Sequence, residues 1–252
     1  MIMILKIKEV YVLNRSICSV FLFMLFFVSF SSAAFADRRS YVWTYEYMTM
    51  LKGRFELEYY LTSKVPDIDR SGINTFEHWL ELEYGITDRW DVAMYQQFKH
   101  ANKAKEADTT YDGFKLRTRY RFAEKGQYLL DPLLYLEYIR SSDFSKPNVI
   151  EIKAILAKDI GKFNFAYNQI LKQETEHDGL TEHEYAVAVG YRLMPKLGFG
   201  LESKGNYTKD KFALGPTVSY RGKGWWTALG AVFGLNDRTN DIETRMIVGI
   251  LF

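Results

Sequence analysis

Apolar and polar side chains alternate along much of the chain. In residues 55–62, with the sequence FELEYYLT, every second residue is apolar and most of those between are polar. Successive side chains of a strand point to opposite faces, so this pattern predicts a strand with one apolar and one polar face. In a helix the same apolar residues would spread over every face. The alternation returns in residues 76–84, 114–122, 150–156, 184–192 and 244–252.

About twelve strands can be counted in this way, each close to the ten residues that a tilted strand needs to cross a bilayer. Their connections alternate in length. Short turns such as 86–89 and 194–196 alternate with longer polar loops such as 66–74 and 101–111. Residues 124–131 break this pattern, because a short turn is expected there and the connection is long. The predicted strands are 53–65, 75–85, 90–100, 112–123, 132–142, 148–159, 162–173, 181–193, 196–206, 211–221, 224–234 and 240–252.

The tenth predicted strand contains the dipeptide Gly215-Pro216. Proline cannot donate a hydrogen bond to a sheet ladder. We therefore predict a bulge or a strand-end irregularity at this point.

Alternation alone also fits a soluble sandwich, which would turn its apolar face into a core. Two observations favour a closed membrane barrel. The strands are long and even in number, and aromatic residues gather near their ends, where they would form interfacial girdles. These aromatic residues are Trp90, Phe98, Phe122, Phe163, Tyr191, Phe199, Tyr220, Trp225 and Phe233. The predicted fold is all-β, a transmembrane antiparallel up-and-down β-barrel over residues 53–252.

The first 36 residues have the pattern of a cleaved signal peptide. Basic residues are followed by an apolar stretch from Ile17 to Phe30, and residues 34–36, Ala-Phe-Ala, suit signal peptidase. A retained membrane helix is the alternative, because the apolar stretch is nearly long enough. The single cysteine, Cys18, lies in this leader. A net charge of +2 and a mean hydropathy of −0.21 exclude a bundle of membrane helices and give no support to nucleic-acid binding.

With its export leader, its alternating strands and its ending MIVGILF, the sequence resembles the bacterial outer-membrane β-barrel proteins, and within them uncharacterised porin-like barrels. The resemblance covers nearly all of residues 53–252. It implies a location in the outer membrane of a Gram-negative bacterium, contact with outer-membrane lipid and lipopolysaccharide, and insertion by the family's machinery through the terminal Phe252. It implies no particular activity.

The polar face of the barrel would line a lumen, with acidic residues on the first two strands and basic residues on the fourth. One interpretation is a water-filled channel with a transverse field, suited to small polar or zwitterionic solutes. The other is that the charges pair across a narrow lumen and satisfy one another. The predicted pore-lining residues are Glu56, Glu58, Glu77, Glu81, Glu83, Lys115, Arg117, Arg119, Arg121, Glu137, Lys153, Glu184, Arg192 and Arg245. Further inward charges include Asp91, Glu151, Lys172, Glu202, Lys204 and Glu243.

Residues 37–52 precede the first strand and include SYVWTYEYMTM, with four aromatic residues on one face. This segment could be an extra strand, a periplasmic strap or a plug. We favour the plug, because later strands carry small inward residues such as Ala188, Gly190 and Gly230. Deleting residues 38–50 should then raise conductance.

Catalytic chemistry has little support. Outer-membrane lipid hydrolases need a nucleophile held by histidine. His78 and His183 are predicted on the lipid face, without a recognisable serine motif. The loop 174–184 carries acidic residues and two histidines that could bind a divalent cation, but we favour a solvated surface loop, with at most lipopolysaccharide held through bridging cations. We assign no catalytic residue, metal or cofactor. The favoured function is a passive channel for small polar or charged solutes; the alternatives are a plugged, charge-paired barrel without transport and, third, a lipid-modifying enzyme.

Overall fold

The computed structural model describes residues 39–70, 72–103 and 106–252, and these contain twelve β-strands and no helix. The predicted leader of residues 1–36, with Cys18, lies outside the described residues. No helix in the described part is long and apolar enough to cross a membrane. The strands are β1 (Phe55–Val65), β2 (Ile73–Thr87), β3 (Trp90–Lys103), β4 (Glu106–Arg121), β5 (Asp131–Ser141), β6 (Val149–Ile160), β7 (Phe163–Glu174), β8 (Thr181–Met194), β9 (Leu197–Asn206), β10 (Lys211–Arg221), β11 (Trp225–Gly234) and β12 (Ile242–Leu251).

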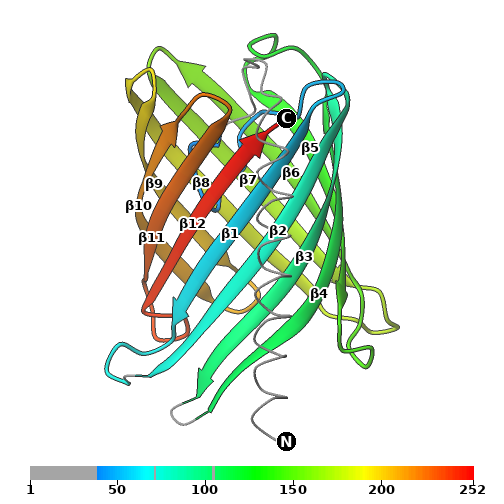
Figure 1. Ribbon diagram of the computed structural model, residues 1–252, viewed down its shortest axis with the longest axis vertical. Helices are drawn as coiled ribbons and strands as arrows, with labels where there is room; N and C mark the ends of the chain where they lie inside the picture. The colour runs from blue at the N-terminus through cyan, green and yellow to red at the C-terminus, as the bar shows by residue number, and fades with distance from the viewer. Residues whose placement is uncertain (1–38, 71, 104–105) are drawn as a thin grey trace, which may run out of the picture.

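Each strand pairs with its neighbours in the chain, and β12 pairs with β1, so the sheet closes on itself (Figure 1). All pairings are antiparallel, from β1 with β2 to β11 with β12. Closure leaves no sheet edge, so every strand has hydrogen-bonding partners on both sides. The predicted all-β, up-and-down barrel of about twelve strands is confirmed.

The predicted loop at residues 101–111 is wrong, because β3 and β4 continue into it as one long hairpin. The sequence pattern predicts a loop here because the outward side chains are polar. In the structure they bind one another across the strands. His100 Nδ1 lies 2.7 Å from Thr109 Oγ1, and Asn102 Nδ2 donates to Asn74 Oδ1 at 2.7 Å.

Pro216 lies within β10 without the predicted bulge. The register with β9 runs through it, pairing Pro216 with Leu201. On the other side the pairs with β11 stop at Leu214 and resume at Thr217 in the same register. A gap of two residues in one ladder therefore accommodates the proline.

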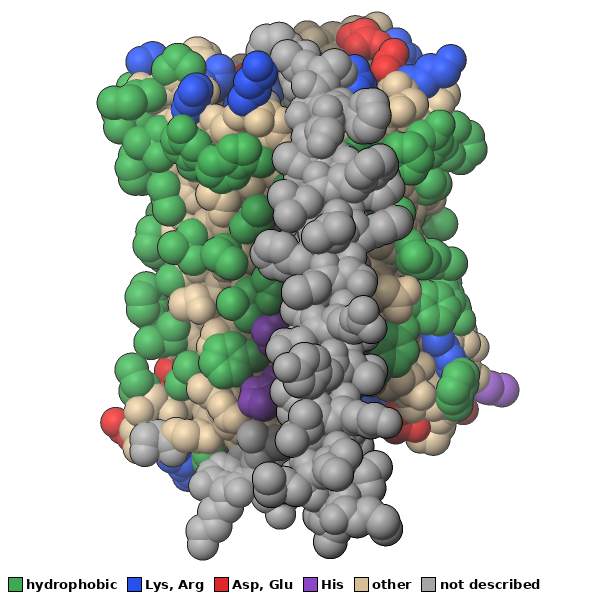
Figure 2. All heavy atoms as spheres, viewed as in Figure 1, with side chains coloured by type: hydrophobic (Ala, Val, Ile, Leu, Met, Phe, Trp, Pro, Cys, Tyr) green, Lys and Arg blue, Asp and Glu red, His purple; other side chains and the backbone are tan. Residues whose placement is uncertain are grey.

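The outer surface between the two ends is apolar. Figure 2 shows hydrophobic side chains over the visible wall, with charged side chains concentrated at both rims. All nine aromatic residues predicted for the girdles point outward and are exposed, among them Trp90, Tyr191 and Trp225. A barrel with an apolar band and aromatic residues near its rims has the surface that a lipid bilayer requires.

The two ends of the barrel differ. The C-terminus and the β2–β3, β6–β7, β8–β9 and β10–β11 turns lie at one end, which we call the turn end (Figure 1). The β1–β2, β5–β6, β7–β8 and β11–β12 connections lie at the other, the loop end. In outer-membrane barrels short turns face the periplasm and longer loops face the outside.

Candidate channel lumen

Residues 39–52, which we call the luminal segment, run through the interior of the barrel in its turn-end half, and the last two of them are exposed. Tyr41, Val42 and Met50 are completely buried, and Tyr47 nearly so. They form two hydrophobic clusters with inward residues of the wall, such as Trp226. The segment takes no part in the barrel ladder apart from one isolated bridge at its end, between Lys52 and Gly85.

Side chains of the barrel wall bind the backbone of the luminal segment. The buried Glu202 carboxylate on β9 accepts hydrogen bonds from the amides of Val42, Trp43 and Thr44, at 2.8–2.9 Å. Asn168 on β7 accepts from the amide of Tyr45 at 2.7 Å and donates to the carbonyl of the same residue at 2.9 Å. These are the contacts that a neighbouring strand would provide, but they come from side chains.

Further contacts fix both ends of the segment. On the β3 side, the amide of Met50 donates to Asp91 Oδ2 at 2.9 Å. At the turn end, Arg221 Nη2 donates to Ser40 Oγ at 3.0 Å, and Ser40 in turn donates to the Glu46 carboxylate. Burial raises the pKa of the Glu46 carboxyl, against the opposing effects of the Ser40 hydrogen bonds and the Arg221 charge. The segment is thus attached to several strands.

The predicted acidic and basic strips meet and pair with each other. Arg117 lies 2.6 Å from Glu81 and 2.7 Å from Glu83. Arg119 lies 2.8 Å from Asp91 and also pairs with Glu83. All five side chains are buried. Acidic β2 and basic β4 flank β3 on the same curved wall, so long side chains reach across and neutralise each other.

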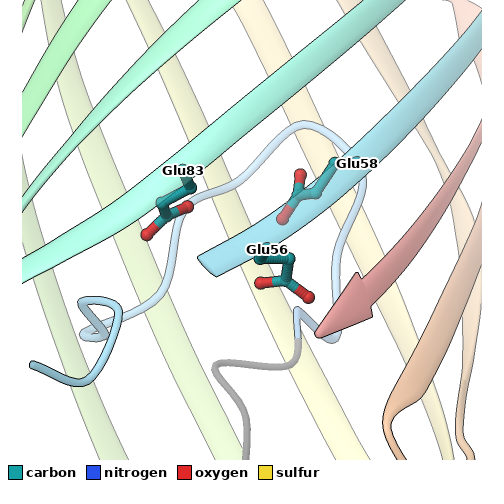
Figure 3. A group of neighbouring side chains, drawn as sticks. All are labelled: Glu56, Glu58 and Glu83. Carbon is teal, nitrogen blue, oxygen red and sulfur yellow. The ribbon is translucent and has the colours of Figure 1, made fainter. Parts of the chain in front are cut away.

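Two more carboxylates, Glu56 and Glu58, lie beside Glu83 of this network (Figure 3). Glu56 and Glu58 on β1 and Glu83 on β2 point into the interior, and one oxygen of each lies within 4.8 Å of the others. In the described part of the chain they are the only such group of potential metal ligands. Glu56 accepts from the indole of Trp226, and Glu58 accepts from Tyr60. These contacts and the arginines make the group part of the charge network. The loop 174–184 forms no comparable cluster; there His177 contacts the neighbouring Asp178, and both are exposed.

The loop-end half of the lumen is open. It forms a vestibule of about 870 Å³, with polar and charged walls. Its floor includes aromatic residues of the luminal segment and of the barrel wall: Trp43, Tyr45, Tyr60, Trp79, Tyr95 and Tyr135. The luminal segment therefore separates the vestibule from the turn end.

Charges in the vestibule form ion pairs, and Lys172 links two of them because it also lies 3.5 Å from Glu151. Lys115 lies 3.0 Å from Glu137, Lys153 lies 2.8 Å from Glu151, and Lys172 lies 2.8 Å from Glu184. Among the described residues Arg245 has no carboxylate within ion-pair distance. Its guanidinium donates to Thr62 and to the carbonyl of Val42, and lies 5.0 Å from the Trp79 ring centre.

The predicted pore-lining residues thus occupy three levels of the interior. The middle level holds Glu56, Glu58, Glu81, Glu83, Arg117 and Arg119. The vestibule is lined by Glu77, Lys115, Glu137, Lys153, Glu184 and Arg245. At the turn end Arg121 donates to Thr49 of the luminal segment, and Arg192 lies exposed at the mouth.

Sequence reasoning missed the role of Asn168. Inward positions of β7 alternate through Asn164, Ala166 and Asn168, so the pattern could have placed this side chain in the lumen. Glu202 was identified as an inward charge, but not as the acceptor of three consecutive amides. Only the path of the luminal segment reveals that role.

No protein-family model matches the chain, and no curated protein matches its sequence. Solved structures do match its fold. A KdgM porin, determined in complex with disordered oligogalacturonate, is 10% identical, with 78% of this chain and 98% of that chain covered and a TM-score of 0.53.

Two further structures agree with this result. An outer-membrane channel from Pseudomonas putida F1 is 10% identical, with 84% and 100% covered and a TM-score of 0.56. The NanC porin is 12% identical, with 79% and 98% covered and a TM-score of 0.52. At these identities the likeness shows the fold, which is that of a porin-like outer-membrane β-barrel.

Proposed function

We propose that the protein is a bacterial outer-membrane channel for small polar or charged solutes, and that the luminal segment restricts its lumen as a plug. The observation that carries the proposal is a closed barrel with an apolar exterior and a charged vestibule of about 870 Å³ inside it. An apolar exterior suits lipid, and a polar interior of this size suits hydrated solutes. The shared fold with KdgM, NanC and the Pseudomonas channel supports the same function.

The orientation follows from the connections. We infer that the turn end faces the periplasm, so that solutes would enter the vestibule from outside and meet the luminal segment at its floor. Phe252, at the end of β12, is proposed to act in recognition by the insertion machinery. Lipid and lipopolysaccharide are the proposed neighbours of the outer wall.

The vestibule favours charged solutes of modest size. Towards its rim, acidic and basic groups stand in partly exposed pairs such as Lys172 with Glu184 and Lys209 with Glu182. Pairs near water are weakly stabilising and exchange partners at small cost. A zwitterionic solute could therefore replace one pair contact with its own charges.

A second candidate is a plugged barrel that has a structural or binding role and transports no solute. It is favoured by the burial of the luminal segment and by the neutralisation of Arg117 and Arg119 around it. In that case the vestibule would be a closed cup.

Single-channel recording in planar bilayers separates the candidates. The purified full-length protein and a variant lacking residues 39–50 would be compared, with barrel folding checked by heat-modifiable gel migration. Discrete current steps that grow in the deletion variant are expected for a plugged channel. Folded barrels that pass no current in either form would contradict the channel and support the closed cup.

A further inference from the structure

The inner wall of β7 to β11 carries features that recognise the backbone of an extended peptide. Glu202 is 1% exposed, and its carboxylate contacts three consecutive amides of the luminal segment. No ion pair of Glu202 with a Lys or Arg occurs within the described residues. The amides of the luminal segment are therefore the hydrogen-bond donors that compensate this buried charge, and a buried carboxylate requires such donors.

Side-chain pockets adjoin this backbone site. A methyl group added at Gly190 would lie 2.6 Å from the Tyr41 hydroxyl, and one at Gly200 would lie 3.0 Å from the same ring. One at Gly230 would lie 2.5 Å from Val42 Cγ2. The contacts at Gly190 and Gly230 are too close for a real side chain, and the one at Gly200 is tighter than most, so the wall follows the shape of the segment. Tyr41 also donates to Asn164 at 2.9 Å.

The barrel does not need the segment to complete its sheet. Its twelve strands close through β1 and β12 without any contribution from residues 39–51. The segment is bound by side chains and by packing, which can be lost without opening the ladder. The luminal segment continues into β1 at the turn end. Once released from the wall, it would therefore leave the lumen through that end.

We propose that this wall is a binding site for an extended, aromatic-rich peptide, and that residues 40–46 are its resident ligand, which is released to open the lumen. Glu202 and Asn168 recognise the peptide backbone; the clefts at Gly190, Gly200 and Gly230 accept the side chains of Tyr41 and Val42. The inference rests on the proposed channel function and adds the site that controls it.

A disulfide provides the test in the full-length protein. Because Val42 Cγ2 lies one bond from Cβ, the two Cβ atoms of a Val42→Cys, Gly230→Cys variant would lie within about 4 Å, which a disulfide can bridge. A Cys18→Ser background removes the native cysteine. Oxidised protein should pass at least tenfold less current than the same protein after reduction. Each single-cysteine variant, which cannot cross-link, should not respond to reductant.

Two results would overturn the proposal. Equal current before and after reduction, with cross-linking verified, would mean that solutes do not pass where the segment lies. No current in either state, together with clear current after deletion of residues 39–50, would mean that the segment is never released. The second result would still support the channel function but would contradict a releasable segment.

Substitution of the acceptor gives an independent measurement. Glu202→Ala should raise the fraction of time in the open state more than Glu202→Gln, because the amide keeps one acceptor oxygen for the segment. A peptide of residues 40–50, added at the turn end of the deletion variant, should block it, and a scrambled peptide should block at least tenfold less well. Failure of the peptide to block a conducting deletion channel, or equal open fractions in both Glu202 variants and the parent, would contradict the site.

Discussion

The two halves of the lumen accommodate charge in different ways. In the middle of the barrel Arg117 and Arg119 share Glu81, Glu83 and Asp91 in one buried network. In the vestibule, lysines meet glutamates beside open space, either as a single pair, as Lys115 and Glu137 do, or in a short chain in which Lys172 contacts Glu151 and Glu184.

This contrast explains how a barrel can hold a peptide segment and still keep an open vestibule. Buried charges demand several fixed partners, because desolvation is costly unless each is compensated. The shared network therefore forms a rigid wall around the luminal segment. Pairs at the rim, such as Lys209 with Glu182, are screened by water and cost little to separate, so the rim of the vestibule can adapt to solutes.

The largest loss in the free energy of unfolding is expected from breaking the buried network. Arg117→Met leaves Glu81 and Glu83 without their shared guanidinium, and loss of one partner of a buried pair costs about 3–5 kcal/mol. The free energy of unfolding should fall by that amount in urea titrations of the protein refolded in lipid vesicles. A change below about 1 kcal/mol, the level of an exposed pair, would show that water reaches this network.

A smaller loss in the free energy of unfolding is expected where a neutral side chain donates a hydrogen bond to the network. Trp226→Phe removes the indole hydrogen bond to Glu56 while keeping an aromatic ring in the hydrophobic cluster. Removing one donor from a buried acceptor costs about 1–3 kcal/mol, which the same urea titration measures. The Trp225→Phe variant, on the exposed outer face, is the matched control and should change stability less.

The smallest effect is expected at the rim of the vestibule. Lys209 pairs with Glu182 at 2.6 Å, and nearly half of the lysine side chain is exposed. Lys209→Met should cost about 0–1 kcal/mol, and less in high salt. A loss as large as that of Arg117→Met would erase the difference between the two halves.

The alternating pattern determined most of the fold. Side-chain alternation placed the twelve strands and their inward charges, because a strand in lipid must turn apolar groups outward and polar groups inward. It failed at residues 101–111, where polar side chains bind each other outside the apolar band, and at Pro216, where a ladder gap replaces a bulge.

The barrel, its strand order and the inward set that includes Arg117, Glu137 and Glu202 could be predicted from the sequence. They follow from local periodicity and from the need to satisfy every backbone group within a membrane. Which charges meet depends on the closed barrel, since partners such as Arg117 and Glu81 lie far apart in sequence. The path of residues 39–52 depends on it too, because the three amides that donate to Glu202 become its neighbours only once β9 is part of the closed wall.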